Sequence, residues 1–133
     1  MEDLIFIEAK EVRTEYIDGI NNLLGQLTSS PKEMNEALLQ AIVESDRTHL
    51  FLAYIGNQMV GMATLAAYVI PTGTKAWVED VVVELVNHMV EYTKKYSPCS
   101  LMLTSRPMRV AANKLYQSVG FEKRETNVYK IQV

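Results

Sequence analysis

The side chains most often used for nucleophilic or metal chemistry are few and widely spaced in this sequence. The single cysteine, Cys99, excludes a disulfide framework and any zinc site built from several cysteines. The two histidines, His49 and His88, are too few and too far apart for a histidine metal centre, so no metal is expected. No motif places a histidine beside Cys99, which begins an apolar stretch. A buried free thiol is therefore favoured over a catalytic nucleophile.

Length and composition indicate one globular domain over residues 1–133, with 48% hydrophobic and 22% charged residues. Thirteen Lys and Arg stand against sixteen Asp and Glu, and the net charge of −3 argues against a nucleic-acid-binding module. The opening MEDLIFIEAKE is too short and too acidic for a secretory signal, and no apolar run approaches the ~20 residues of a membrane span. A cytoplasmic protein without a membrane or nucleic-acid partner is expected.

Hydrophobic spacing predicts the order β-α-α-β-β-β-α-β-α-β, and therefore an α/β fold with a mixed sheet. Gly56-Asn57 predicts a tight hairpin, and Gly120 predicts the end of the last helix. Ser30-Pro31 predicts the start of the second helix, with Glu33 completing a capping box. Predicted strands cover residues 4–9, 50–55, 59–70, 76–83, 99–104 and 128–133; predicted helices begin at Thr14 and Ser30 and carry apolar faces from Leu85 and from Ala112. The second helix should bury Met34, Ala37, Leu38, Ala41 and Ile42.

The junction between the strand at 76–83 and the following helix is too short. Such connections normally take about 2–6 residues, yet no Gly, Pro, Asn, Asp or Ser lies between Val81 and Val86 to turn the chain or cap the helix. Either the connection is distorted, or residues of a longer natural loop are missing from this chain.

Two stretches, AWVEDVVV at 76–83 and LTSRPMRVAANKLYQSVGFEKRETNVYKI at 103–131, carry a family resemblance. Together they resemble the central strand and the A-x-x-L-Y-x-x-x-G-F helix of the GCN5-related N-acetyltransferase (GNAT) superfamily, which uses acyl-CoA donors. The predicted element order agrees with that fold over the whole chain. The family's glycine-rich R-G-x-G-x-G/A segment, whose backbone cradles the cofactor pyrophosphate, is absent at the short junction. A true deletion would weaken acyl-CoA binding or mark a non-catalytic member.

The resemblance implies transfer of an acetyl group from acetyl-CoA to a primary amine of a small molecule or peptide. It implies Glu79 as the base that accepts the amine proton through water, with Asp80 as a weaker competitor. It implies Tyr116 as the acid that protonates the leaving thiolate. For both Glu79 and Tyr116, an ordinary structural role is the alternative, as a strand carboxylate and a core tyrosine respectively.

For the cofactor, the resemblance implies that the backbone of Val81, Val82 and Val83 binds the pantetheine arm where the central strand separates from its parallel neighbour. An ordinary buried strand is the alternative. Asn113 is a further candidate for the pantetheine arm. Arg106 and Arg109 are candidates for cofactor phosphate or an acidic substrate, and Thr104 with Ser105 is a candidate lining of the acceptor pocket.

The sequence thus predicts a single GNAT-like acetyltransferase domain that uses acetyl-CoA and no metal. The alternative is a degenerate GNAT-like module that binds a ligand or partner without transferring an acetyl group. The final strand could pair with a second copy, so a homodimer is possible.

Overall fold

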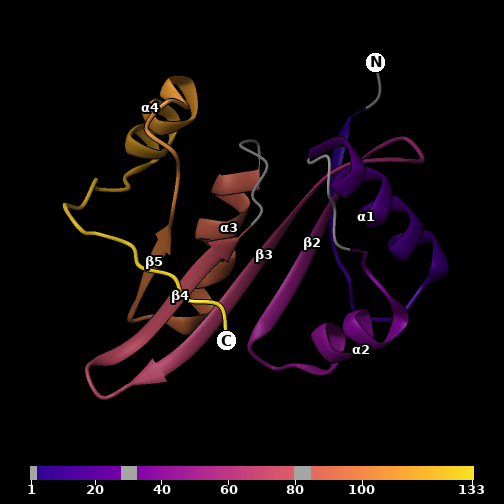
Figure 1. Ribbon diagram of the computed structural model, residues 1–133, viewed down its shortest axis with the longest axis horizontal. Helices are drawn as coiled ribbons and strands as arrows, with labels where there is room; N and C mark the ends of the chain where they lie inside the picture. Colours follow the sequence, from indigo (N-terminus) through magenta and orange to yellow (C-terminus); the bar gives the residue numbers. More distant parts are fainter. Residues whose placement is uncertain (1–2, 28–32, 80–84) are drawn as a thin grey trace.

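A computed structural model describes residues 3–27, 33–79 and 85–133. Its centre is one five-stranded sheet in the order β1-β2-β3-β4-β5 (Figure 1). The strands are β1 (Leu4–Glu8), β2 (Thr48–Ile55), β3 (Gln58–Ile70), β4 (Gly73–Glu79) and β5 (Cys99–Leu103). The first four pair antiparallel, and β4 pairs parallel with β5, so the predicted mixed sheet is confirmed.

Helices cover both faces of the sheet. They are α1 (Thr14–Leu27), α2 (Glu36–Glu44), α3 (Val86–Thr93) and α4 (Val110–Val119), and a short 3₁₀ turn, η2 (Lys94–Tyr96), extends α3. In Figure 1, α1 and α2 lie beside the β1–β2 side of the sheet, and α3 lies behind β4. Among the described residues, no helix has the length and apolarity that crossing a bilayer requires.

The alternation of side chains along the strands builds two separate cores. Phe51, Leu65 and Val78 point toward α3, where they pack with Leu85 and Met89. Leu50, Leu52, Met59 and Met62 point the other way, toward Ile20 of α1 and Leu39 of α2. Each such fully buried side chain contributes roughly 1.5–3 kcal/mol of transfer free energy, so both faces of β2 hold the fold together.

The local signals for α1, the hairpin and the last helix are confirmed. α1 begins at Thr14 and buries Ile20 as its spacing predicts. The β2–β3 turn falls on Gly56-Asn57, with Gly56 at φ 59°, a conformation that glycine adopts without strain. Gly120, at φ 123°, follows the last residue of α4 as its C-cap.

The predicted start of the second helix is wrong. Residues 30–32 lie outside the described part of the chain, but Glu33 to Asn35 are not helical and α2 begins at Glu36. Asn35 is the N-cap, because its side-chain oxygen accepts from the backbone N–H of Leu38 at 2.8 Å. Asn21 of α1 holds both backbone polar groups of Met34, which keeps that residue outside the helix. The register therefore buries Leu39, while Ala37, Leu38 and Ala41 are exposed, against prediction.

The predicted last strand is also wrong. Residues 121–133 have no regular secondary structure, and Val128, Tyr129, Ile131 and Val133 are between 77% and 109% exposed. Alternating apolar residues define a strand face, but a strand also needs a partner. No tight-turn signal between residues 121 and 128 supplies a hairpin partner.

Candidate functional site

The site that the sequence predicts lies at the end of the described pairing between β4 and β5. Their parallel register runs from Thr74–Cys99 to Val78–Leu103 and ends there, one residue before β4 ends at Glu79 and at the last residue of β5. Val81, Val82 and Val83, the predicted pantetheine-binding edge, lie with Asp80 and the short junction outside the described residues. The described part of the seam is thus paired up to the predicted site and not beyond Val78.

Tyr116 comes to this region from α4. Its side chain is 4% exposed and packs with Val86 and Ala112 between α3 and α4, and Phe121 lies edge-on to its ring with centroids 6.2 Å apart. Its hydroxyl is buried and has no hydrogen-bond partner among the described residues. A buried phenol without a partner costs free energy. A ligand atom or a water molecule that accepts a hydrogen bond from the hydroxyl would relieve that cost.

Glu79 is exposed at the end of β4. Because Ala76 and Val78 point into the core beside α3, the alternation places Glu79, Trp77 and Lys75 on the opposite face of the sheet. Glu79 pairs in register with Thr64 of β3. The candidate base thus lies on the face of the sheet away from α3, whereas the candidate acid packs against Val86 of α3.

The loop between β5 and α4 forms an open, partly basic pocket of about 500 Å³. It is lined by Arg106 and Arg109 together with Thr104, Ser105, Pro107 and Val128 of the C-terminal tail. The Ser105 hydroxyl is buried and, like that of Tyr116, has no partner among the described residues. Two arginines and an unpartnered hydroxyl suit an anionic, oxygen-rich ligand such as a phosphate.

Asn113 already has a structural role at this pocket. Its side-chain amide donates to the backbone oxygen of Arg106 at 3.0 Å, and its backbone N–H donates to that of Arg109 at 2.9 Å. These contacts fix the loop that carries both arginines. Its role toward the pantetheine arm remains a prediction, as does phosphate binding by Arg109.

An aromatic pair lies on the same face of the sheet as Glu79. Trp77 donates its indole N–H to the hydroxyl of Tyr68 on β3 at 2.7 Å, and Tyr68 is 41% exposed. The pair was not foreseen, although the hairpin register around Pro71–Thr74 could have indicated it, because Tyr68 faces Lys75 and Ala66 faces Trp77 across the two strands.

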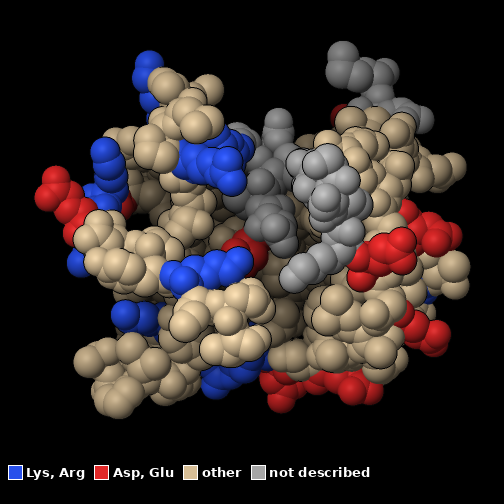
Figure 2. All heavy atoms as spheres, in the orientation of Figure 1, with Lys and Arg blue, Asp and Glu red and all other residues tan. Residues whose placement is uncertain are grey.

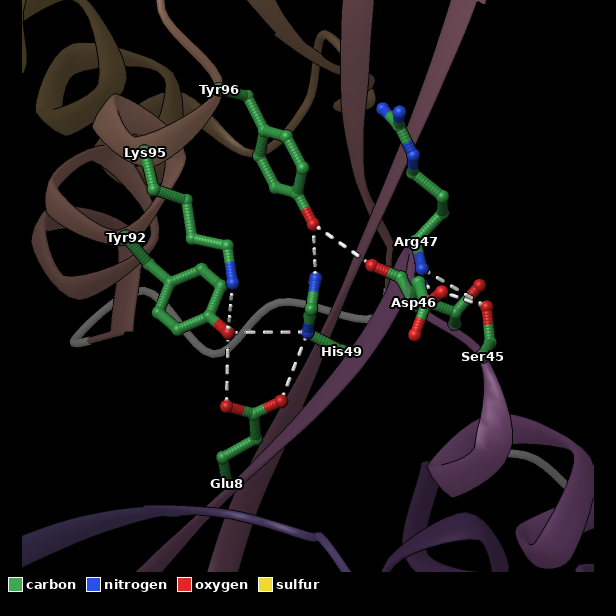
Figure 3. A network of polar contacts seen from close by, with 9 residues as sticks. Glu8, Ser45, Asp46, Arg47, His49, Tyr92, Lys95 and Tyr96 are labelled. Carbon is green, nitrogen blue, oxygen red and sulfur yellow. Dashed lines mark hydrogen bonds and ion pairs between the residues drawn. The ribbon is translucent and has the colours of Figure 1, made fainter.

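A buried polar cluster lies away from this site, between β1, β2 and the end of α3 (Figure 3). His49, 6% exposed, contacts the Glu8 carboxylate through Nδ1 at 2.9 Å and the Tyr96 hydroxyl through Nε2 at 2.5 Å. Tyr92 donates to the other oxygen of Glu8 at 3.0 Å and accepts from Lys95 at 2.9 Å. His49 is thus hydrogen-bonded within the protein through both ring nitrogens.

Counting protons defines two arrangements for this cluster. A doubly protonated His49 donates to both Glu8 and Tyr96, and leaves the Tyr96 hydroxyl free to donate to the backbone oxygen of Asp46, 3.2 Å away. A neutral ring protonated on Nδ1 instead accepts from Tyr96, which must then release Asp46. In both arrangements Glu8 is the central acceptor. Burial raises the pKa of the Tyr96 hydroxyl and favours its protonated form.

Charge is divided between the two halves of the chain. Residues 1–46 carry ten acidic and three basic residues, whereas residues 47–133 carry six acidic and ten basic ones. Figure 2 shows the result on one face, with acidic side chains gathered over α1 and α2 and basic ones mainly on the side of β4, β5 and α4. Charges of opposite sign are thus separated across this face.

Comparison with known proteins finds similarity at the level of fold. No family model matches the sequence, and no curated protein is similar to it. A putative acetyltransferase from Agrobacterium tumefaciens has a TM-score of 0.79 at 22% identity, over 96% of this chain and 99% of that one. An aminoglycoside acetyltransferase from an uncultured soil metagenomic sample, in complex with trehalose, has a TM-score of 0.78 at 14% identity. The match covers 98% of this chain and 95% of that one. The aminoglycoside N-acetyltransferase AAC(6')-Iy in complex with CoA has a TM-score of 0.70 at 14% identity. The match covers 99% of this chain and 96% of that one.

These likenesses cover nearly the whole chain, so the protein has the GNAT fold, as its sequence predicts. The structural neighbours include acetyltransferases, some of them in complex with CoA or acetyl-CoA, and a protein from Bacillus halodurans described as a transcriptional regulator.

Proposed function

We propose that the protein transfers an acetyl group from acetyl-CoA to a primary amine. The observation that carries the proposal is the buried Tyr116 hydroxyl, which has no partner among the described residues and lies on the helix that follows the end of the β4–β5 seam. The GNAT fold and the acetyltransferases that share it support the reaction class.

In the proposed reaction, the amine nitrogen forms a bond to the thioester carbonyl carbon, and the carbon–sulfur bond then breaks. Glu79 accepts the proton lost by the amine, through a water molecule. Tyr116 donates its proton to the departing thiolate. The phenol is the weaker acid by roughly 1.5 pKa units, so this transfer is uphill by only a modest amount. Arg106 and Arg109 bind phosphate of the donor.

Thermal unfolding with added acetyl-CoA tests donor binding. At a hundred times its Kd, the donor should stabilise the folded state by about 2.7 kcal/mol. Arg109→Gln should weaken that stabilisation, while Lys114→Gln, on the exposed surface of α4, is the matched control and should not. No stabilisation at millimolar acetyl-CoA would refute the proposal.

Release of CoA in the presence of an amine tests transfer. Removing a group that donates a proton in the transition state typically costs 10²–10⁴-fold in rate, so Tyr116→Phe should reduce kcat by about that factor. Donor binding without any release of CoA from a range of amines would instead support the non-catalytic alternative.

A further inference from the structure

The face of β4 that carries Glu79 has an ordered row of three chemically different side chains. Glu79, Trp77 and Lys75 alternate with the buried Val78 and Ala76, so all three point away from α3. At ~3.3 Å per residue, neighbours in the row are roughly 6.6 Å apart and its ends roughly 13 Å apart along the strand. The row therefore presents a carboxylate, an apolar surface and an ammonium in sequence.

This part of the sheet is not covered by helices. The core beneath α1 and α2 takes Met59 and Met62 from β3 and extends no further along that strand. Tyr68, opposite Lys75 in register, widens the apolar part through its hydrogen bond with Trp77 and stays 41% exposed. We call Lys75, Trp77, Glu79 and Tyr68 the β4 platform.

The C-terminal tail leaves the platform accessible, because Glu79 and Tyr68 are exposed and Lys75 and Trp77 are partly exposed. Figure 1 shows the tail passing in front of β5 and β4. Its apolar side chains from Val128 to Val133 are nevertheless at least 77% exposed, so they are not packed on the aromatic pair. Neither Glu79 nor Lys75 forms an ion pair with another described residue. Both charges are thus available to a ligand.

We propose that the β4 platform binds the acceptor, and that it selects an amine with an apolar body and a negatively charged far end. The inference rests on the proposed function, because it places the reacting amine at Glu79. The amine lies against Glu79, the apolar body lies on Trp77 and Tyr68, and the distal anion lies against Lys75. A cationic far end is disfavoured, because Lys75 repels it. Short peptides and conjugates of amino acids have this chemistry.

Trp77 makes the test direct, because it is the protein's only tryptophan. Its emission should change as 8-aminooctanoate is titrated in, since this compound has an amine, an apolar chain and a carboxylate of suitable length. Octylamine lacks the carboxylate, and 1,8-diaminooctane replaces it with a second amine. The expected order of affinity is 8-aminooctanoate, octylamine, 1,8-diaminooctane, with steps of about threefold, as for partly exposed ion pairs.

A charge reversal gives the decisive variant. Lys75→Glu should invert the order, so that 1,8-diaminooctane binds most tightly, and Lys75→Gln should remove the difference between 8-aminooctanoate and octylamine. Lys94→Glu, on the exposed surface of η2, is the matched control and should leave the order unchanged. Because Lys75 lies outside both cores, the variants should fold, and their urea midpoints check this. An unchanged order in Lys75→Glu would overturn the inference, as would emission that responds to none of the three compounds.

The outcomes separate the platform from the reaction. If acetyl-CoA binds and amines are acetylated with no preference set by Lys75, the platform inference fails while the proposed function stands. If emission follows the predicted order but acetyl-CoA is not used, the platform is a binding site and the proposed function fails.

Discussion

Replacing Glu8 with Gln tests how strongly the buried polar cluster holds β1 to the rest of the fold. The Glu8 side chain is only 17% exposed and accepts from His49 at 2.9 Å and from Tyr92 at 3.0 Å. Hydrogen bonds to charged groups contribute roughly 1.5–3 kcal/mol each, and the glutamine oxygen can keep one of the two. The NH2 group of the glutamine also faces one of these two donors, from which it cannot accept a hydrogen bond. We expect Glu8→Gln to lower the free energy of unfolding by about 2–4 kcal/mol.

Urea unfolding followed by circular dichroism measures this loss. With a slope of roughly 2 kcal/mol per molar urea, the midpoint should fall by about 1–2 M. Glu91→Gln is the matched control, because Glu91 lies on α3 beside Tyr92 but is 69% exposed, in an ion pair with Lys94. Exposed pairs of this kind contribute little. If the two variants shift the midpoint equally, the cluster does not stabilise the fold as argued.

Three further perturbations test other parts of the structure. Leu39→Ala should lower the free energy of unfolding by about 2–5 kcal/mol, whereas Leu38→Ala, at a side chain 49% exposed, should change it little; equal urea midpoints would contradict the register of α2. Tyr116→Phe should not lower the urea midpoint, because its hydroxyl has no partner to lose in the described part of the chain, and a destabilised variant would show that the hydroxyl is bonded in the free protein. Burial raises the pKa of the Cys99 thiol, so the thiolate forms only at higher pH; alkylation by iodoacetamide should therefore be slower at pH 8 than for a cysteine peptide, and an equal rate would refute the shift.

Local signals predicted most of the architecture. The spacing in α1, the Gly56-Asn57 turn and Gly120 each act within a few residues, and each is found where it was expected. The start of the second helix was predicted wrongly because a contact distant in the sequence competes with the local signal. Ser30, Pro31 and Glu33 match the capping-box pattern in the sequence, but Asn21, thirteen residues before Met34, holds the backbone of that residue. The helix then starts at the next capping side chain, Asn35.

Sequence reasoning found side chains for the candidate site but not their neighbours. Tyr116 and Glu79 were singled out by a family resemblance, whereas the orphaned state of the Tyr116 hydroxyl depends on packing from α3 and α4. The contact between Glu8 and His49 joins residues 41 positions apart. Helix and strand periodicity relate only residues that are close in the sequence, so they cannot predict it. The last strand was predicted from its own alternation, although a strand depends equally on the partner beside it.

The single parallel seam has a consequence for the order in which the molecule assembles. β2, β3 and β4 follow one another through short turns, so this meander can form from contacts that are close along the chain. β5 reaches β4 only after the α3 crossover has been laid down, and β1 must return across more than forty residues to meet β2. We therefore expect the central meander to form early and the edge strands to dock late. A nascent chain would then acquire its scaffold well before the seam between β4 and β5 is complete.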